Sequence, residues 1–280
     1  MTINTAAFAE LIWPGIVDIF GQTYQDHPPL YPSMFDVKTS DKAFEKVQGL
    51  TDYGTAAVKD QGAQLAFDDP IQGFQKEYVN VTYAKGATIT LEMMQDEQYN
   101  VFNDIPRGLA RAMRKTEETV GANIYNNGFS TETAADGLSA FNSAHLNVDG
   151  TTFSNVPTVA ADLTQTSLEQ AVVDISDYVD DRGLPILVQG KILIVPTALQ
   201  HIAKKILGTN FAVGTADNDI NTVAGTMELV VNPYLTDTDA WFIKTDADNG
   251  FTWMDRMKAE IDRENEFNTK NLQFSVIRRL

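Results

Sequence analysis

The 280-residue sequence contains no cysteine, which excludes disulfide bonds, zinc–thiolate centres and cysteine nucleophiles. Histidine is scarce, and His27, His145 and His201 lie far apart without the HExxH spacing of a zinc protease. No stretch approaches the roughly 20 apolar residues of a membrane-spanning helix, and the opening MTINTAAFAE does not resemble a secretory signal. We therefore expect no metal, no cofactor, no membrane partner and an intracellular product.

Basic residues are in the minority: 21 Lys and Arg stand against 38 Asp and Glu, which gives a net charge of −17. Tight binding to nucleic acid of any sequence needs clustered basic residues, so this balance argues against it. The acidity does not prevent the chain from enclosing DNA, because a container wall should not stick to its contents. The length and the 43% of hydrophobic residues suit one large domain or two smaller lobes.

Recognisable catalytic and nucleotide-binding motifs are missing as well. A triad is assembled by the fold rather than within one loop, and no G-x-S-x-G elbow is present. We therefore interpret the polar residues of the loop 136–150 as turn formers. The Gly-Lys pair at 190–191 is followed by isoleucine instead of the Ser or Thr of a phosphate-binding loop. The rejected hydrolase candidates in the loop are Asp136, Ser139, Ser143 and His145.

A near-match to a calcium-binding loop lies in the acidic segment around residues 208–226. Thr222 stands where the pattern requires glycine, and the following LVVNP favours a strand instead of a helix. A chance match explains the pattern better than calcium binding does. The matching residues are Asp217, Asp219, Asn221 and Glu228.

Alternation of apolar and polar residues is clearest over 79–93, where the odd positions are apolar except at Lys85. This period of two predicts β structure with one buried face and a bend near Lys85-Gly86. The preceding stretch 51–74 is rich in glycine and poor in large aliphatic residues, and it is too long for an ordinary turn. Such a segment is either disordered or in contact with another chain.

Pro14 lies within the apolar stretch 5–20 and should interrupt any helix there, which favours a short arm packed on a neighbouring surface. A long helix is expected from 105 to about 127, after the cap candidate Asn103-Asp104 and with Gly128 at its end. Its apolar spacing is set by Leu109, Met113, Thr116, Val120 and Ile124.

The basic residues of this helix, followed by Glu117 and Glu118, favour a solvated face, and contact with DNA is the alternative. They are Arg107, Arg111, Arg114 and Lys115.

The second half of the chain predicts a mixed α/β lobe, because a buried strand feeds directly into a helix. The expected elements are a helix over 165–179, a strand over 191–195, a helix from Pro196 to Gly208 with Leu199, Ile202, Ala203 and Ile206 on one face, and short strands over 227–231, 241–244 and 272–277.

The order of these features resembles a known family. LEMMQDEQYN leads into the long helix, FNSAHLN lies in the loop behind it, and FNTKNLQF precedes the chain's last residues. From about Thr51 onward the sequence is similar to the Mu-like major head subunits of tailed phages, which adopt the Hong Kong 97 capsid fold. The resemblance implies a mixed α+β fold and a structural major capsid protein rather than an enzyme.

The resemblance also implies a division of the chain. The expected parts are an N-terminal arm (1–41), an extended β loop (42–84), a peripheral domain with the long spine helix (85–164), an axial α/β domain (165–250) and a return to the peripheral domain (251–280). The loop would contact a neighbouring subunit through Val58, Lys59, Leu65, Phe67 and Ile71. The axial domain would place the acidic pair Asp217 and Asp219 near a capsomer axis.

The implied product is a virion shell of pentamers and hexamers around double-stranded DNA, assembled in the host bacterial cytoplasm. The chain starts at the arm, so we expect a separate scaffolding protein, with portal and decoration proteins as further partners. Members of the family often continue past the last strand, whereas this sequence ends at Leu280. Some relatives of this fold join a lysine to an asparagine, but no partner matches Lys59, and no cross-link is expected.

Three other functions compete with this interpretation. An encapsulin-type nanocompartment has the same fold and a similar length, and stores a cargo enzyme instead of DNA. A soluble α/β enzyme is disfavoured because no coherent site is present. A tail or accessory protein is disfavoured by the order of helix, loop and strands.

Overall fold

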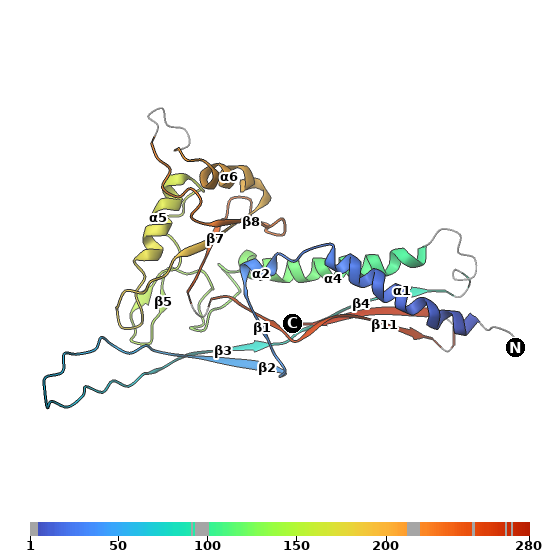
Figure 1. Cartoon of the computed structure of the whole chain (residues 1–280), viewed down its shortest axis with the longest axis horizontal. Coiled ribbons are helices and arrows are strands. Elements are labelled where there is room, and N and C mark those ends of the chain that lie inside the picture. Colours follow the sequence, from blue (N-terminus) through green and yellow to red (C-terminus); the bar gives the residue numbers. More distant parts are fainter. Residues whose placement is uncertain are drawn as a thin grey trace.

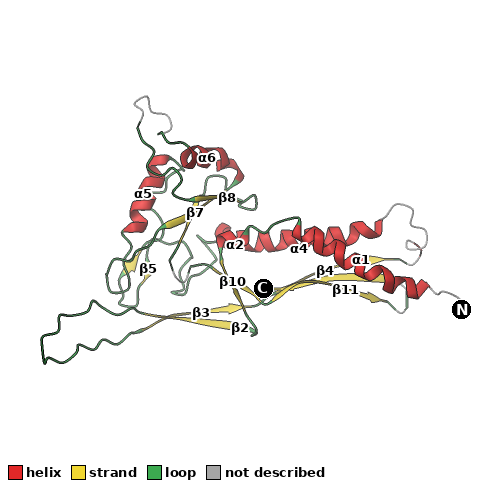
Figure 2. Ribbon diagram, viewed as in Figure 1, coloured by secondary structure: helices red, strands yellow, loops and turns green. Residues whose placement is uncertain are grey.

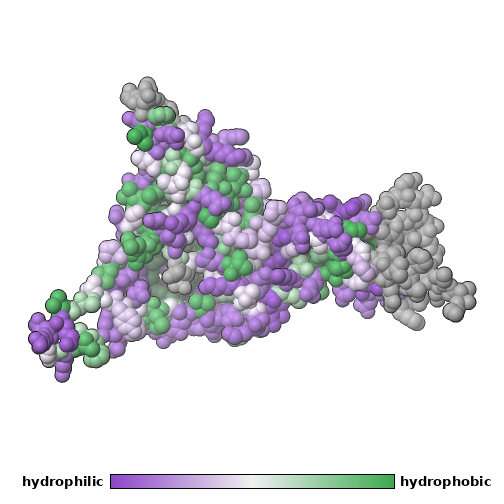
Figure 3. All heavy atoms as spheres, in the orientation of Figure 1, coloured by the Kyte–Doolittle hydropathy of each residue, from purple (hydrophilic) through white to green (hydrophobic). Residues whose placement is uncertain are grey.

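The computed structural model describes residues 5–90, 92, 101–211, 219–247, 250–266, 268–269 and 271–280. A helix–sheet layer, an α/β lobe and a long hairpin extend in three directions from the centre of the molecule, giving it a three-cornered outline (Figures 1 and 3). The expected mixture of helices and strands is confirmed. No helix within the described ranges is long and apolar enough to cross a bilayer.

The helix–sheet layer consists of two helices on one face of an antiparallel sheet with strand order β11-β12-β4 (Figure 2). The middle strand turns Leu272, Phe274 and Val276 inward at alternate positions, against Leu109 and Met113 of the long helix. The layer is built from α1 (Thr5–Gln25), β4 (Thr82–Ile89), α4 (Val101–Asn126), β11 (Met257–Asn265) and β12 (Leu272–Arg279).

The prediction that Pro14 interrupts a helix is wrong, because α1 continues through it. Ile16 and Phe20 are buried against α4 and the sheet, and Trp13 and Tyr24 pack beside them at the same helical spacing. This packing stabilises the helix against the cost of an internal proline, which is about 3 kcal/mol. The segment therefore lies on its own subunit instead of on a neighbouring surface.

The alternating stretch is also divided differently from the prediction. Its inward face is confirmed at Ile89, but β3 (Gln72–Val79) ends before β4 begins, and Gly86 pairs with Ser275 in regular register. The break falls at Asn80, whose buried side-chain Nδ2 donates to the carbonyl of Lys42 at 2.8 Å. This amide fixes the chain where it passes from the hairpin into the sheet.

The long helix is present, but it begins at Val101, so the cap candidate Asn103-Asp104 lies inside it. Arg114, Glu117 and Glu118 are buried, and the prediction of a solvated face is wrong for these three residues.

The α/β lobe is organised around β7, which lies between β8 and β9. Leu193 and Val195 face the core of the lobe, whereas Ile194 faces a second, aromatic cluster that includes Tyr125 of α4. A single strand thus joins two cores. The expected helix face includes Ala203 and Ile206, but Ile202 is exposed. The elements are α5 (Gln165–Ser176), β7 (Gly190–Val195), η1 (Thr197–Leu199), α6 (Gln200–Gly208), β8 (Glu228–Val231) and β9 (Phe242–Thr245).

Shorter pairs connect these parts. The strands β1 and β10 run parallel, and β2 and β3 form the antiparallel base of the hairpin. The sequence analysis predicted no individual strand at the positions of β2, β10 and β11. The remaining elements are α2 (Tyr31–Met34), β1 (Asp36–Thr39), β2 (Phe44–Leu50), β5 (His145–Leu146), β6 (Thr152–Phe153) and β10 (Thr252–Asp255).

A buried charge cluster, consisting of Glu117, Arg114, Arg278 and Asp255, lies where the last residues of β12 meet α4. The carboxylate of Glu117 is 2.7 Å from Nη1 of Arg114 and 2.7 Å from Nη1 of Arg278. Tyr24 of α1 donates its hydroxyl to the same carboxylate. The cluster therefore fixes α1, α4 and β12 to one another.

The electrostatics of the cluster follow from burial and from these partners. Burial and the hydrogen bond to Glu117 raise the pKa of Tyr24, so the phenol stays protonated and donates. Burial disfavours the charged form of Arg278, but the attraction of Glu117 outweighs it and the pKa of Arg278 is raised.

We expect Glu117→Gln to lower the free energy of unfolding by about 3–5 kcal/mol, because two buried guanidinium groups lose the carboxylate at 2.7 Å, which leaves Arg278 with the more distant carboxylate of Asp255 at 3.3 Å. Urea unfolding of the unassembled chain, followed by circular dichroism, measures the change. The matched control is Asp104→Asn, which removes an exposed pair with Arg107 on the same helix and should cost less than about 1 kcal/mol. Equal losses in the two variants would contradict the role of the cluster.

Two glycines around α4 should respond in opposite directions to alanine. A Cβ on Gly128 would meet the ring of Phe141 at 2.5 Å, so Gly128→Ala should lower the free energy of unfolding by about 1–3 kcal/mol. A Cβ on Gly108 would meet no atom within 4 Å, so Gly108→Ala should raise it by about 0.5–1 kcal/mol. Thermal unfolding of both variants beside the parent chain tests the pair, and a shift of the same sign in both would refute it.

Candidate assembly surfaces

The hairpin extends away from the body of the subunit, and every residue from 52 to 71 is exposed (Figure 1). Its apolar side chains are highly exposed to solvent: Val58 is 96% exposed and Phe67 is 91% exposed. Figure 3 shows hydrophobic residues in green among hydrophilic ones at the far end of this hairpin. This concentration of exposed apolar side chains on one segment makes the hairpin a candidate contact surface. The five predicted contact residues, Val58, Lys59, Leu65, Phe67 and Ile71, are all exposed.

The base of the hairpin is held in a defined position. Thr51 donates its backbone N–H to the carbonyl of Ile71, and Lys46 forms a cross-strand ion pair with Glu77 at 3.2 Å. Lys76 reaches across to the carbonyl of Thr133 in the loop behind α4. The strands are therefore anchored, while the loop beyond Thr51 projects into solvent.

One side chain of the α/β lobe contacts the projecting loop. Arg182 lies 2.6 Å from Oδ2 of Asp68 and also donates to the carbonyl of Asp69 at 3.2 Å. Asp68 and Asp69 are neighbours in the sequence, but their partner lies more than a hundred positions away along the chain. Only the fold could identify it.

The predicted basic face of the spine helix is smaller in the structure than in the prediction. Arg107, Arg111 and Lys115 are exposed at intervals of four residues, so they form one stripe along α4. Arg114 does not belong to it, because its guanidinium is buried against Glu117 and stacks over the ring of Tyr24.

The acidic loop is described only in part. Asp219 is exposed, whereas Asp217 lies outside the described residues. Asn221 is buried and uses its side chain to hold the loop, donating to the carbonyl of Thr209 at 2.8 Å. Its Oδ1, the atom that a cation would use, accepts the backbone N–H of Val223 at 3.2 Å. Within the described ranges, no cluster of three potential metal ligands occurs.

His145 and Asp136 form a buried pair in the loop behind α4, with Nδ1 of His145 2.8 Å from the carboxylate. Burial alone would raise the pKa of Asp136, but hydrogen bonds from His145 and from the N–H groups of Leu138 and Leu146 outweigh it and lower the pKa. The candidate serine Ser139 instead donates to the carbonyl of Phe141. The pair therefore braces a turn, and in the part of the chain that the structure describes neither Ser139 nor Ser143 bonds to Nε2 of His145, which is buried without a partner.

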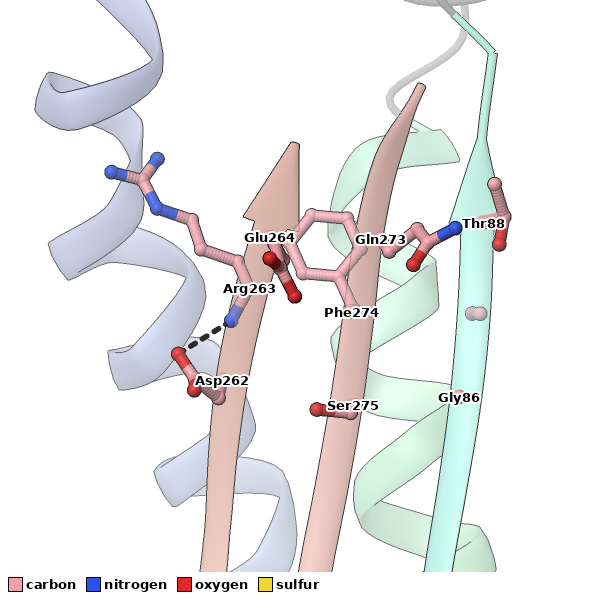
Figure 4. Close-up of a pocket in the computed structure, with 9 residues that line it drawn as sticks. Gly86, Thr88, Asp262, Arg263, Glu264, Gln273, Phe274 and Ser275 are labelled. Carbon is pink, nitrogen blue, oxygen red and sulfur yellow. Dashed lines mark hydrogen bonds between the residues drawn. The ribbon is translucent and has the colours of Figure 1, made fainter. Parts of the chain in front are cut away.

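A shallow groove runs along the sheet on the side away from α1 and α4 (Figure 4). Gly86 and Ser275 face each other at its floor, and Asp262 and Glu264 stand on the β11 side. Asp262 accepts the backbone N–H of Arg263 at 2.7 Å. Its lining contains no histidine, and no group of three potential metal ligands occurs in the part of the chain that the structure describes.

Comparison with known proteins identifies a family for this chain. The chain matches the model of the phage capsid protein family over residues 75–279. No curated protein sequence matches it.

Solved structures with the same fold are phage capsids and related particles. The bacteriophage JBD30 capsid has a TM-score of 0.61 at 13% identity, covering 75% of this chain and 92% of the other. The JBD30 procapsid has a TM-score of 0.57 at 16% identity, covering 83% and 100% of the two chains. A virus-like particle from Pyrococcus furiosus has a TM-score of 0.54 at 11% identity, covering 95% and 92%.

These likenesses confirm the Hong Kong 97 capsid fold, and the family match disfavours both an enzyme and an encapsulin-type compartment. Because the family model covers most of the chain, the protein belongs to the phage capsid protein family and is a structural component of a virion shell.

Proposed function

We propose that the chain forms the pentamers and hexamers of an icosahedral phage head, and that the exposed hairpin joins each subunit to its neighbour. The observation that carries the proposal is the exposure of Val58, Leu65 and Phe67 on a loop with an anchored base. Burying a side chain of this size contributes about 1.5–3 kcal/mol. A neighbour that covers all three would gain enough to stabilise a contact repeated throughout a shell.

The remaining parts fit the same role. We propose that the helix–sheet layer is the peripheral domain, that the α/β lobe is the axial domain, and that the chain is a head subunit of the Mu-like type. Assembly in the bacterial cytoplasm would involve a separate scaffolding protein, a portal and decoration proteins. The net charge of −17 suits a shell that encloses DNA without binding it tightly. The stripe of Arg107, Arg111 and Lys115 is too small to change that balance.

We expect a chain in which a short Gly-Ser bridge replaces residues 52–70 to fold normally but to form no shells. The replaced residues are all exposed, so little core is lost and the midpoint of thermal unfolding should shift by less than about 4 °C. Sedimentation velocity and negative-stain microscopy should find only monomers or isolated capsomers. Normal shells would refute the role of the hairpin, and an unfolded product would show that it belongs to the core of the subunit.

A matched pair of variants separates apolar contact from loop length. The first variant carries Val58→Ser, Leu65→Ser, Phe67→Ser and Ile71→Ser, and it should lose shells as the replacement does. The control carries Asp60→Ser, Gln61→Ser and Gln64→Ser at equally exposed polar positions, and it should assemble.

We further propose that Asp217 and Asp219 lie near a capsomer axis, where copies of the same charge converge and repel. Assembly yield should then rise with divalent cations, and the double variant Asp217→Asn with Asp219→Asn should assemble well without them. Light scattering during assembly, with and without millimolar magnesium, measures both effects. A parent yield that does not respond to cations would contradict an axial position.

A further inference from the structure

Hydrogen bonds within the lobe and within the hairpin position the two partners of the contact between Arg182 and Asp68. Arg182 projects from a tight turn in which the carboxylate of Asp180 accepts the backbone N–H groups of Arg182 at 2.9 Å and Leu184 at 2.8 Å, and Gly183 adopts a φ of 76°. The turn presents the guanidinium to the hairpin in a fixed direction.

On the hairpin, a backbone hydrogen bond likewise holds the carboxylate of Asp68 in place. Its carboxylate also accepts the backbone N–H of Gly54 at 2.8 Å, which closes the loop across its two sides. These hydrogen bonds, first from Gly54 and then from Arg182, lower the pKa of Asp68. Among the described residues, Arg182 is also the one side chain outside the hairpin that makes polar contact with the loop 52–70.

The surroundings of Arg182 are acidic. Burial and the neighbouring carboxylates of Asp149, Asp180 and Asp52 raise the pKa of Asp181 in the same turn. Asp52 belongs to the hairpin, while the other carboxylates belong to the lobe and to the loop beside it. Without the guanidinium, carboxylates on both sides of the contact would repel one another.

We propose that Arg182 and Asp68 form a clasp that holds the hairpin against its own subunit before assembly, and that opening this clasp releases the hairpin to the neighbour. The proposal rests on the intersubunit role of the hairpin. An exposed ion pair is weak, and the like charges around it favour separation once it breaks. The clasp thus restrains the hairpin without locking it.

The absence of cysteine allows a direct test, because introduced cysteines are labelled without background. Spin labels at Gln61→Cys in the hairpin and Val173→Cys in α5 report the distance between hairpin and lobe by pulsed electron paramagnetic resonance. Both positions are exposed. In the dilute, unassembled full-length chain, the parent should give a narrow distance distribution. With Arg182→Gln, the open population should rise by up to about fivefold.

Two further variants test whether the positive charge of Arg182 is what keeps the distance distribution narrow. Arg182→Lys keeps a cation and should stay close to the parent. Lys191→Gln, the matched control, removes an exposed pair with Asp246 at 3.3 Å in the same lobe and should leave the distribution unchanged. A narrow distribution in Arg182→Gln would overturn the clasp, and so would one in Arg182→Lys as broad as that of the glutamine variant.

The clasp should also affect the rate of assembly. Arg182→Gln should assemble up to about fivefold faster than the parent at low salt, and this advantage should shrink as salt weakens the parent's ion pair. Light scattering follows the rate, and an unchanged or slower rate would contradict restraint by the clasp. The spin-label experiment measures the position of the hairpin in the unassembled chain, whereas the replacement of residues 52–70 tests whether shells form. A failure of the clasp is therefore distinguishable from a failure of the intersubunit role of the hairpin.

Discussion

The carboxylate of Glu117 is the group on which the helix–sheet layer depends. A buried charge is costly unless its partners satisfy it, and here two guanidinium groups and a phenol do so from separate parts of the chain. Arg114 comes from the same helix, Tyr24 from the first helix and Arg278 from the last strand. Apolar packing alone would allow these elements to slide, whereas charged hydrogen bonds at 2.7 Å fix their register.

The subunit separates the residues that stabilise it from the residues that are left for assembly. Its cores are continuous because β7 has one face in the α/β lobe and the other against the aromatic cluster around Tyr125. The hairpin, by contrast, pairs its backbone but leaves Val58 and Phe67 in water. A wall protein needs this division, since a subunit that satisfied all of its own apolar surface would have no reason to join another.

The sequence predicted those elements whose signal is local. The apolar run of β7, the spacing of α5 and the inward face of β4 were read correctly because each depends on a short period. The errors arose where a distant partner decides: packing on α4 preserves α1 despite Pro14, and Arg278 draws Glu117 into the core. The contact of Arg182 with Asp68 could not be inferred for the same reason. The exposure of the predicted hairpin residues agrees with their proposed role, which stays a prediction.

The middle strand of the sheet, β12, is also the last of its strands to be synthesised. While the ribosome is still translating, β4 and β11 have no strand between them, and Glu117 lacks Arg278. The layer therefore closes only after translation has passed residue 278. A chain that stops before β12 would leave β4 and β11 without the strand that joins them, and Glu117 without Arg278.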